Sequence, residues 1–185
     1  MRIVSGTHKS KRITAPKNLP VRPTTDMAKE SLFNILNNDY YFDEVRVLDL
    51  FSGTGNISYE FASRGTEQII SVDQNLNCIR FIQKTAEDLG FSAISTIKAD
   101  VFEFLAKHKQ EHDIIFADAP YDLEGLDKII EVVFSQKLLS QIGVLIIEHP
   151  KEQDFSELPY FSSKRRYGNV NFSFFEWNEE EDING

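Results

Sequence analysis

Two short segments of this sequence carry the residue types that could do chemistry. Residues 48–55 read Leu-Asp-Leu-Phe-Ser-Gly-Thr-Gly, an apolar strand that runs into a turn with two glycines. Glycine lets a backbone turn tightly and approach a ligand closely, so this segment, the glycine turn, is a candidate cofactor site. Residues 118–121 read Asp-Ala-Pro-Tyr and follow another apolar strand. We call them the amine clamp, because a carboxylate, a directed carbonyl and an aromatic ring could together hold a flat amine.

The amine clamp ends a predicted buried strand, which would deliver its carboxylate, Asp118, to a crevice. Ala119 precedes Pro120 and is therefore biased towards an extended conformation, which could direct its carbonyl at the same amine. Tyr121 offers a ring that could stack on a base. Alone, the tetrapeptide would be a strand-terminating turn with an incidental aromatic ring. Beside the glycine turn on a neighbouring strand, a catalytic role is favoured.

Acidic residues end three of the predicted strands. Asp73 follows Gly53 by 20 residues, the spacing at which an acidic residue meets the ribose hydroxyls of a bound nucleotide. The other two acids at strand ends are Asp49 and Asp100. The dinucleotide fingerprint G-x-G-x-x-G is incomplete here, because Ser58 stands at the position of its third glycine. Three acids would repel a pyrophosphate and suit a positive sulfonium, so the pattern favours S-adenosylmethionine over NAD. Each acid could instead cap a helix, and for Asp100 the two interpretations weigh equally.

The elements that must position these residues alternate between strands and helices from residue 45 onward. The hydrophobic pattern predicts strands over 45–51, 68–73, 93–97, 113–118 and 144–148, with helices between them over 57–64, 76–89, 101–107 and 126–134. Near-continuous apolar strands separated by helices indicate a parallel sheet covered on both faces. Residues 161–167 and 171–177 come with only a Gly-Asn turn between them and predict a closing antiparallel hairpin. The fold class is therefore α/β, Rossmann-like and doubly wound, with ligands bound at the carboxyl ends of the strands.

The chain divides into a basic N-terminal hairpin and arm, residues 1–23, and a main domain, residues 24–185. The net charge is −9, yet the first thirty residues hold seven basic and two acidic side chains. Such asymmetry indicates a polyanion partner at the basic end, and a solvated arm without a partner is the alternative. The candidate RNA-binding residues of this basic arm are Lys9, Lys11, Arg12, Lys17 and Arg22. Three basic residues near the closing hairpin could extend the same surface, namely Lys164, Arg165 and Arg166.

Composition places the chain among cytoplasmic proteins. Its single cysteine, Cys78, excludes an internal disulfide framework and suits a reducing compartment. No secretion signal precedes the first element, and no stretch is long and apolar enough to cross a membrane. The four histidines show no ligand spacing, so we expect no metal. We also expect a monomer.

Several motifs resemble one family over nearly the whole chain. They read Arg-Ile-Val-Ser-Gly at 2–6, Val-Arg-Pro-Thr-Thr-Asp at 21–26, Glu-Ser-Leu-Phe-Asn at 30–34, the glycine turn, Ser-Arg-Gly at 63–65 and Tyr-Gly at 167–168. Together they resemble the RsmD family of class I S-adenosylmethionine-dependent methyltransferases, which methylate N2 of a guanine in small-subunit (16S) ribosomal RNA. The Arg-Pro-Thr-Thr-Asp stretch with Leu-Phe-Asn is the specific part. The glycine turn alone would name only the superfamily.

The resemblance implies a role for each candidate residue. The methionine end of the cofactor would be lined by Asp49, Phe51, Gly53 and Gly55. Asp73 would hold the ribose and Asp100 the adenine amino group. The catalytic residues would be Asp118, Ala119, Pro120 and Tyr121. Such enzymes usually carry Asp-Pro-Pro-Tyr or Asp-Pro-Pro-Phe, so Ala119 keeps the acceptor carbonyl but loses the rigidity of a proline.

The implied partner is ribosomal RNA, the small subunit or an assembly intermediate. Two alternatives stay open at this point. One is a methyltransferase of the same fold that acts on another amine, such as adenine N6 or a protein glutamine, since fold does not decide substrate. The other is a non-catalytic module that binds S-adenosylmethionine or RNA without turnover.

Overall fold

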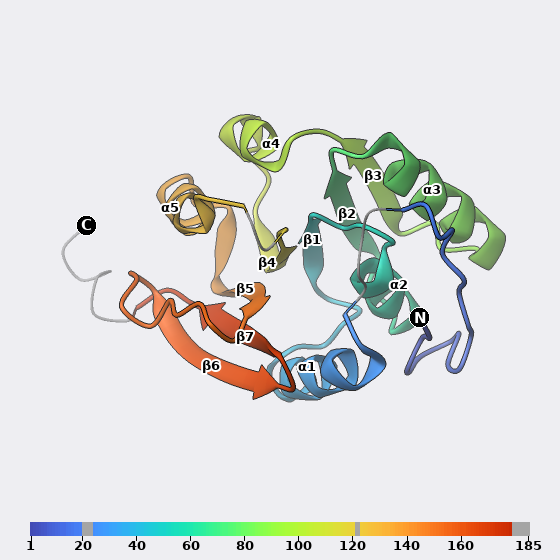
Figure 1. Ribbon diagram of the computed structural model, residues 1–185, viewed down its shortest axis with the longest axis horizontal. Helices are drawn as coiled ribbons and strands as arrows, with labels where there is room; N and C mark the ends of the chain where they lie inside the picture. Colours follow the sequence, from blue (N-terminus) through green and yellow to red (C-terminus); the bar gives the residue numbers. More distant parts are fainter. Residues whose placement is uncertain (20–23, 121–122, 179–185) are drawn as a thin grey trace.

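A single seven-stranded sheet organises the protein (Figure 1). The computed structural model describes residues 1–19, 24–120 and 123–178. Within them the helices are α1 (Asp26–Asp39), α2 (Asn56–Ser63), α3 (Leu76–Leu89), α4 (Val101–Lys107) and α5 (Leu126–Ser135). The strands are β1 (Arg46–Leu50), β2 (Gln68–Asp73), β3 (Ile94–Lys98), β4 (His112–Asp118), β5 (Leu139–Pro150), β6 (Phe161–Tyr167) and β7 (Val170–Phe175).

The strand order is β3-β2-β1-β4-β5-β7-β6. The first five strands in this order are parallel, and β7 is antiparallel to both of its neighbours. The predicted fold class, including the closing hairpin, is thereby confirmed. The order reverses between β1 and β4, and a crevice opens outside the carboxyl ends of the strands at such a switch point. The glycine turn follows β1 and the amine clamp follows β4, so both border this crevice.

Two strands, β2 and β6, have their predicted ranges, and β3, β4 and β7 shift by one or two residues at their ends. The differences in β1 and β5 have physical reasons. β1 ends at Leu50 because Phe51 has a φ of 56°, a left-handed conformation that no strand accommodates. β5 begins at Leu139 instead of residue 144, because Leu139 pairs with His112 before an irregularity in the register of β4. The segment between Leu139 and Val144 is not uniformly apolar, so hydrophobicity alone could not extend the strand.

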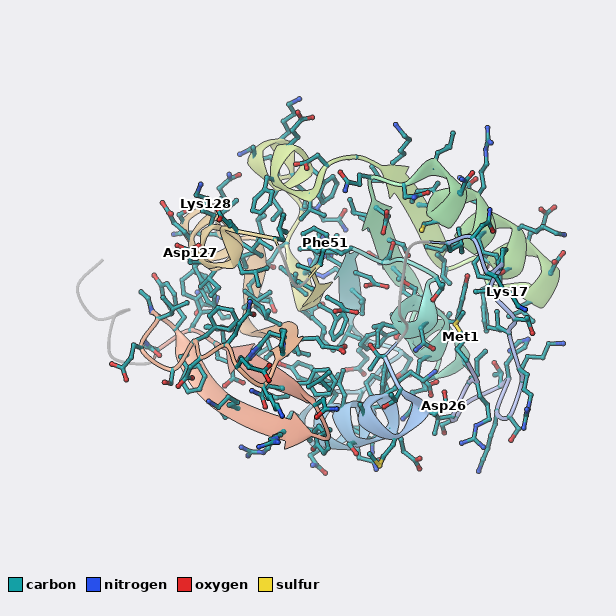
Figure 2. The ribbon with its side chains drawn as sticks, in the orientation of Figure 1. Met1, Lys17, Asp26, Phe51, Asp127 and Lys128 are labelled. Atoms are coloured by element: carbon teal, nitrogen blue, oxygen red, sulfur yellow. The ribbon has the colours of Figure 1, made fainter. Side chains whose placement is uncertain are left out.

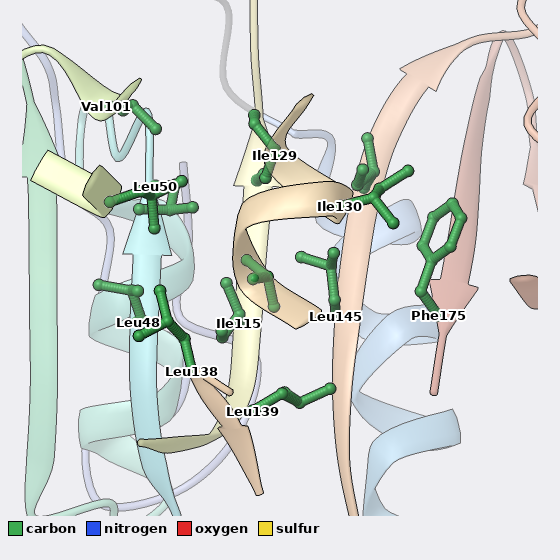
Figure 3. Close-up of a cluster of buried hydrophobic side chains, with 14 of the residues drawn as sticks. Leu48, Leu50, Val101, Ile115, Ile129, Ile130, Leu138, Leu139, Leu145 and Phe175 are labelled. Carbon is green, nitrogen blue, oxygen red and sulfur yellow. The ribbon is translucent and has the colours of Figure 1, made fainter. Parts of the chain in front are cut away.

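Apolar residues fill both faces of the sheet. On one face α4 and α5 cover a cluster in which Ile129 and Ile130 lie over Leu48, Ile115 and Leu145 (Figure 3). On the other face α1 and α2 pack against the alternate residues of the same strands, a cluster that includes Val47, Ile114, Phe116 and Ile146. The helices therefore cover both sides of the central parallel strands, which places the polar strand ends at the rim between them.

The N-terminal segment, residues 1–19, packs against the helices instead of standing free. Ile3 and Ile13 are buried in a cluster with Tyr59 of α2 and Ile82 of α3. The expected hairpin takes the form of an isolated antiparallel bridge between Arg2 and Arg12. The proposed domain division after residue 23 stays a prediction, because residues 20–23 lie outside the described part of the chain.

A buried ion pair joins this segment to α1 and α2. Lys29 Nζ lies 3.2 Å from Glu60 Oε2, and both side chains are fully buried. Lys29 Nζ also donates to the Arg2 carbonyl at 2.6 Å and to Asn56 Oδ1 at 2.8 Å. The carboxylate of Glu60 accepts from the backbone N–H groups of Val4 and Ser5 at 2.8 and 3.0 Å. Burial lowers the pKa of Lys29, and the neighbouring Glu60 opposes that effect.

We expect Glu60→Gln to destabilise the protein by about 3–5 kcal/mol, because it leaves the buried ammonium of Lys29 without its counter-charge. Urea denaturation at neutral pH measures the effect. Asp88→Asn is the matched control: it removes one carboxylate from the exposed Lys84–Asp88 pair and should cost less than about 1 kcal/mol. Equal effects of the two variants would contradict the structural importance of the buried pair.

Candidate active site

The glycine turn is held in place by the end of β2. Gly53 and Gly55 have φ values of 54° and 80°, conformations that favour glycine. Gly55 also lacks room for a side chain, since a Cβ atom there would lie 2.7 Å from Cζ of Tyr59. The N–H of Gly53 donates to Asp73 Oδ2 at 2.9 Å. The turn and the acid that follows it by 20 residues in the sequence therefore form one unit.

Asp73 has a fixed carboxylate at the mouth of this turn. Its second oxygen, Oδ1, accepts from the N–H of Asn75 at 2.8 Å, and the residue is 8% exposed. Each carboxylate oxygen accepts one of these bonds and retains further acceptor capacity. Asp73 can therefore hold the turn and still accept hydrogen bonds from ligand hydroxyls.

Asp49 lies buried beneath the turn, 2% exposed. Its Oδ2 accepts a hydrogen bond from Ser58 Oγ at 2.6 Å, and Ser58 in turn bonds Ser71 Oγ at 2.7 Å. Burial raises the pKa of Asp49 to about 7; the Ser58 bond opposes this shift and nearby Asp73 adds to it. No basic side chain pairs with Asp49 among residues 1–19, 24–120 and 123–178. A buried carboxylate without a counter-charge fits a ligand that brings an amine or a cation.

Ser58 is a hydrogen-bond partner of Asp49 that the sequence did not reveal. It stands where the dinucleotide fingerprint has its third glycine, which marked it only as a departure from that pattern. In the structure its hydroxyl orients Asp49. The sequence shows only that Ser58 follows Asp49 by nine residues, and this spacing alone does not predict a contact between a strand-end acid and a helical serine.

Asp100 caps a helix. Its Oδ1 accepts from the N–H groups of Phe102 and Glu103 at 2.9 and 3.0 Å, at the N-terminus of α4. The structure therefore confirms that Asp100 caps a helix. The carboxylate is exposed, and Oδ2 accepts no hydrogen bond from the described residues, so contact with a ligand amino group stays a prediction.

The amine clamp stands at the carboxyl end of β4. Asp118 is the last residue of that strand and is partly exposed, Ala119 is buried and Pro120 is exposed. Tyr121 lies outside the described residues. Burial raises the pKa of Asp118 well above its ordinary value, and the neighbouring Glu148 and Asp49 raise it further.

Glu148 is the acidic neighbour that sequence analysis missed. It lies on β5 as the register partner of Asp118 and is 4% exposed. Its Oε2 accepts a hydrogen bond from Thr24 Oγ1 at 2.6 Å, and burial raises its pKa to about 7. The available signal was its place at the end of the last predicted parallel strand. The next residue, His149, is structural: it is fully buried and its Nε2 bonds Ser173 Oγ at 2.7 Å.

The basic arm lies on the side of the molecule that carries α2 and α3. Figure 2 shows Lys17, Met1 and Asp26 on that side, with Phe51 at the centre near the end of β1. Four of the five candidate side chains are exposed, namely Lys9, Lys11, Arg12 and Lys17. Arg22 lies outside the described residues. Residues 164–166 lie on β6, at the opposite edge of the sheet from β3 (Figure 1), so they do not extend the arm.

A pocket of about 470 Å³ lies between the N-terminal segment and the start of α1. Its lining comprises Met1, Arg2, Arg12, Ile13, Thr14, Thr24, Thr25 and Asp26. Thr24 thus faces this pocket and also bonds Glu148. Thr24 therefore links a pocket beside the basic arm to Glu148, the register partner of Asp118.

Comparison with known proteins agrees with this geometry. The sequence model of the family described as "Conserved hypothetical protein 95" matches residues 1–176. "Putative rRNA methyltransferase YlbH" of Bacillus subtilis (strain 168) is 32% identical over 161 residues, covering 85% of this chain and 86% of that protein. "Ribosomal RNA small subunit methyltransferase D" of Buchnera aphidicola subsp. Baizongia pistaciae is 29% identical over 148 residues, covering 80% and 75% of the two chains.

Solved structures share the fold. "Putative methyltransferase yhhF from Escherichia coli" has a TM-score of 0.83 and 24% identity, covering 95% of this chain and 96% of that one. The Thermus thermophilus "16S rRNA N2 G1207 methyltransferase (RsmC) in complex with AdoMet and Guanosine" has a TM-score of 0.70 and 19% identity, covering 86% and 45%. Strand order, glycine turn and these neighbours define a Rossmann-like, class I methyltransferase fold. Within that class, the chain belongs to the conserved hypothetical protein 95 family, the RsmD family that its motifs indicated.

We expect Asp49→Asn to stabilise the protein more at pH 8 than at pH 5. The folded chain raises the pKa of Asp49 from 3.8 to about 7, so it retains a proton that the unfolded chain releases. This contribution to stability therefore falls as the pH rises from about 4 to about 7.

Asparagine still offers an oxygen to Ser58 but carries no charge. Its advantage over aspartate should grow by about 2–3 kcal/mol between the two pH values, since each pKa unit corresponds to about 1.4 kcal/mol. Urea denaturation at both pH values measures the difference. Asp43→Asn, at an exposed aspartate, is the control. An identical pH dependence of stability in both variants would contradict the raised pKa of Asp49.

Proposed function

We propose that this protein is an S-adenosylmethionine-dependent methyltransferase that methylates the exocyclic N2 of a guanine in small-subunit ribosomal RNA. The observation that carries the proposal is the placement of the glycine turn and the amine clamp on adjacent strands, β1 and β4, at the switch point of the sheet. A cofactor on the first and an amine on the second would meet in one crevice. The names of the relatives support an RNA substrate.

The carboxylates at the glycine turn fit S-adenosylmethionine. Asp73 keeps acceptor capacity for ribose hydroxyls, and Asp49 is a buried carboxylate without a basic partner in the described part of the chain. A dinucleotide would bring a pyrophosphate towards these acids, at a cost that a sulfonium avoids. Phe51, Gly53 and Gly55 would line the methionine end, and Asp100 would meet the adenine amino group. The cofactor would supply an electrophilic methyl group on a positively charged sulfur.

The amine clamp would prepare the nucleophile. The lone pair of guanine N2 is delocalised into the ring, so the amine is a weak nucleophile until its geometry is constrained. Asp118 and the carbonyl of Ala119 would accept its two N–H groups, orient the lone pair and stabilise the positive charge that develops on nitrogen. Transfer of the methyl group supplied by the cofactor would require N2 to lose one proton. The raised pKa of Asp118 makes that carboxylate a suitable acceptor for this proton.

The remaining residues would hold the base and the RNA. Pro120 would fix the turn, and Tyr121 would stack on a base extruded from its helix. The basic arm would bind phosphates, which explains how a protein with a net charge of −9 could hold a polyanion. No helix within the described residues is long and apolar enough to cross a membrane, and those residues hold no cluster of three potential metal ligands. We place the protein in the cytoplasm, acting on ribosomal RNA, the small subunit or an assembly intermediate.

We expect Asp118→Asn to reduce methyl transfer by about 10²-fold or more, because it removes a preorganised acceptor from the reacting amine. Tritium transfer from labelled S-adenosylmethionine to unmodified small subunits, followed by nucleoside analysis, measures the rate and identifies the product. The rise in melting temperature caused by S-adenosylmethionine should persist in Asp118→Asn and disappear in Asp73→Asn.

Asp127→Asn, at an exposed position on α5, is the matched control and should match the wild type in both assays. Product identity separates the alternatives, since N6-methyladenosine or methylated protein would replace the proposed substrate. Binding of the cofactor without transfer to any substrate would indicate a non-catalytic module. Full activity in Asp118→Asn would overturn the proposed mechanism.

We expect the combined replacement of Lys9, Lys11 and Arg12 by alanine to weaken RNA binding and to flatten its dependence on salt. Each phosphate contact that is lost should reduce the slope of log affinity against log salt by about 0.7–0.9. Titration of the RNA at several salt concentrations measures the slope. Alanine at Lys164, Arg165 and Arg166 removes the same charge from the opposite sheet edge and is the control. An equal loss in both variants would show a general effect of net charge.

A further inference from the structure

Two carboxylates stand side by side at the carboxyl edge of the sheet. Asp118 of β4 and Glu148 of β5 are register partners on parallel strands, so their side chains leave the same face of the sheet about 5 Å apart. Glu148 forms no ion pair in the described part of the chain, and its one hydrogen bond there comes from Thr24. The proposed chemistry uses Asp118 and leaves Glu148 unassigned.

A structural role does not account for an acid at position 148. Burying a carboxylate without a counter-charge is costly, and a neutral side chain could accept the Thr24 hydroxyl equally well. Glu148 is nevertheless fixed in orientation by a chain of contacts. The Thr24 carbonyl accepts from Asn56 Nδ2 at 3.0 Å, and Asn56 Oδ1 accepts from the buried Lys29. The carboxylate is therefore held rigidly in a place where it costs stability, as expected of a group that meets a ligand.

The pattern of two acceptors matches guanine. The Watson–Crick edge of guanine presents the N1–H and the N2 amine as adjacent donors. Adenine presents its N6 amine beside N1, which is an acceptor, and a glutamine side chain has a single amine beside its carbonyl. Enzymes that act on an extruded base read this edge by hydrogen bonds. One carboxylate opposite the amine and a second opposite N1 would accept guanine and repel adenine.

We propose that Glu148 determines the specificity of the site for guanine by accepting the N1–H of the target base, while Asp118 accepts from its N2 amine. This inference rests on the proposed function. Thr24 donates to Oε2 of Glu148 and so fixes the orientation of the carboxylate, which leaves Oε1 to accept from the base. The two donors of guanine also relieve the repulsion between the paired acids, which an empty or adenine-filled site would retain.

The test compares guanine with 2-aminopurine at the target position. The modified guanine is first mapped with the wild-type protein, and RNA carrying 2-aminopurine at that position is then prepared. 2-Aminopurine keeps the amine that is methylated, but its N1 is an acceptor. The wild type should prefer guanine in kcat/KM by on the order of 10-fold to 100-fold, the range for one well-placed contact to a base. Glu148→Gln, whose amide can either accept or donate, should reduce this preference to within about threefold.

Binding gives a readout that does not depend on turnover. The fluorescence of 2-aminopurine reports its entry into the site, and Glu148→Gln should bind this RNA more tightly than the wild type does. If Glu148→Gln does not fold, Thr24→Val removes the bond that positions the carboxylate and should likewise narrow the preference. An unchanged preference in the variant that folds, with equal losses on both RNAs, overturns the inference and leaves the proposed function intact. Failure of the wild type to methylate any guanine overturns the proposed function itself.

Discussion

The buried ammonium of Lys29 is the constraint on which much of this structure depends. A fully buried charge is tolerated only where hydrogen bonds and a counter-charge replace water. Two segments supply three such partners: the N-terminal segment provides the Arg2 carbonyl, and α2 provides Asn56 and Glu60. α1, α2 and the first residues of the chain are therefore held in one arrangement. Through Asn56 and Thr24 the same network reaches Glu148 at the rim of the crevice.

The crevice itself gathers negative charge. Asp49, Asp73, Asp118 and Glu148 all stand at or near the carboxyl ends of parallel strands, and parallel pairing brings those ends to one edge. Burial raises the pKa of Asp49, Asp118 and Glu148, and neighbouring carboxylates raise the pKa of Asp49 and Asp118 further. Such a site is poorly satisfied when empty and is improved by ligands that bring N–H donors and positive charge. A sulfonium cofactor and a guanine edge have this character, so in the proposed complex they would offset the electrostatic cost that the free protein carries.

In the proposed complex, the acidic site and the basic arm would recognise different parts of the substrate. Exposed lysines and arginines on the N-terminal segment suit phosphates, whereas the buried acids suit a base and a cofactor that carry donors. Ion pairs with phosphate set affinity and orientation without reading sequence, and contacts to base edges provide the selection. Thr24 lines the pocket beside the arm and also bonds Glu148, so it lies between the two regions.

Features that depend on one or two consecutive elements could be predicted from the sequence. The glycine turn was evident because Gly53 and Gly55 directly follow an apolar run, and the positive φ values of these glycines follow from the turn itself. The position of Asp73 beside the glycine turn could be predicted from its distance to Gly53, since one βαβ unit fixes that spacing. The Rossmann-like order and the closing hairpin followed from alternating strands and helices and from the turn between residues 167 and 170. In each case the signal lay within one or two consecutive elements.

Tertiary structure alone decided what lies beside these residues. Glu148 lies beside Asp118 because β5 pairs with β4 in one register, and Thr24 bonds it across 124 positions of sequence. Ser58 replaced a glycine in the fingerprint, yet its hydroxyl orients Asp49 once α2 packs on β1 and β2. The burial of Lys29 and the docking of Ile3 and Ile13 likewise needed partners from distant elements. Sequence determined which residues end the strands, because hydrophobic periodicity and turn chemistry are local; register and helix packing decided which of them meet, because those contacts form between segments that no local pattern connects.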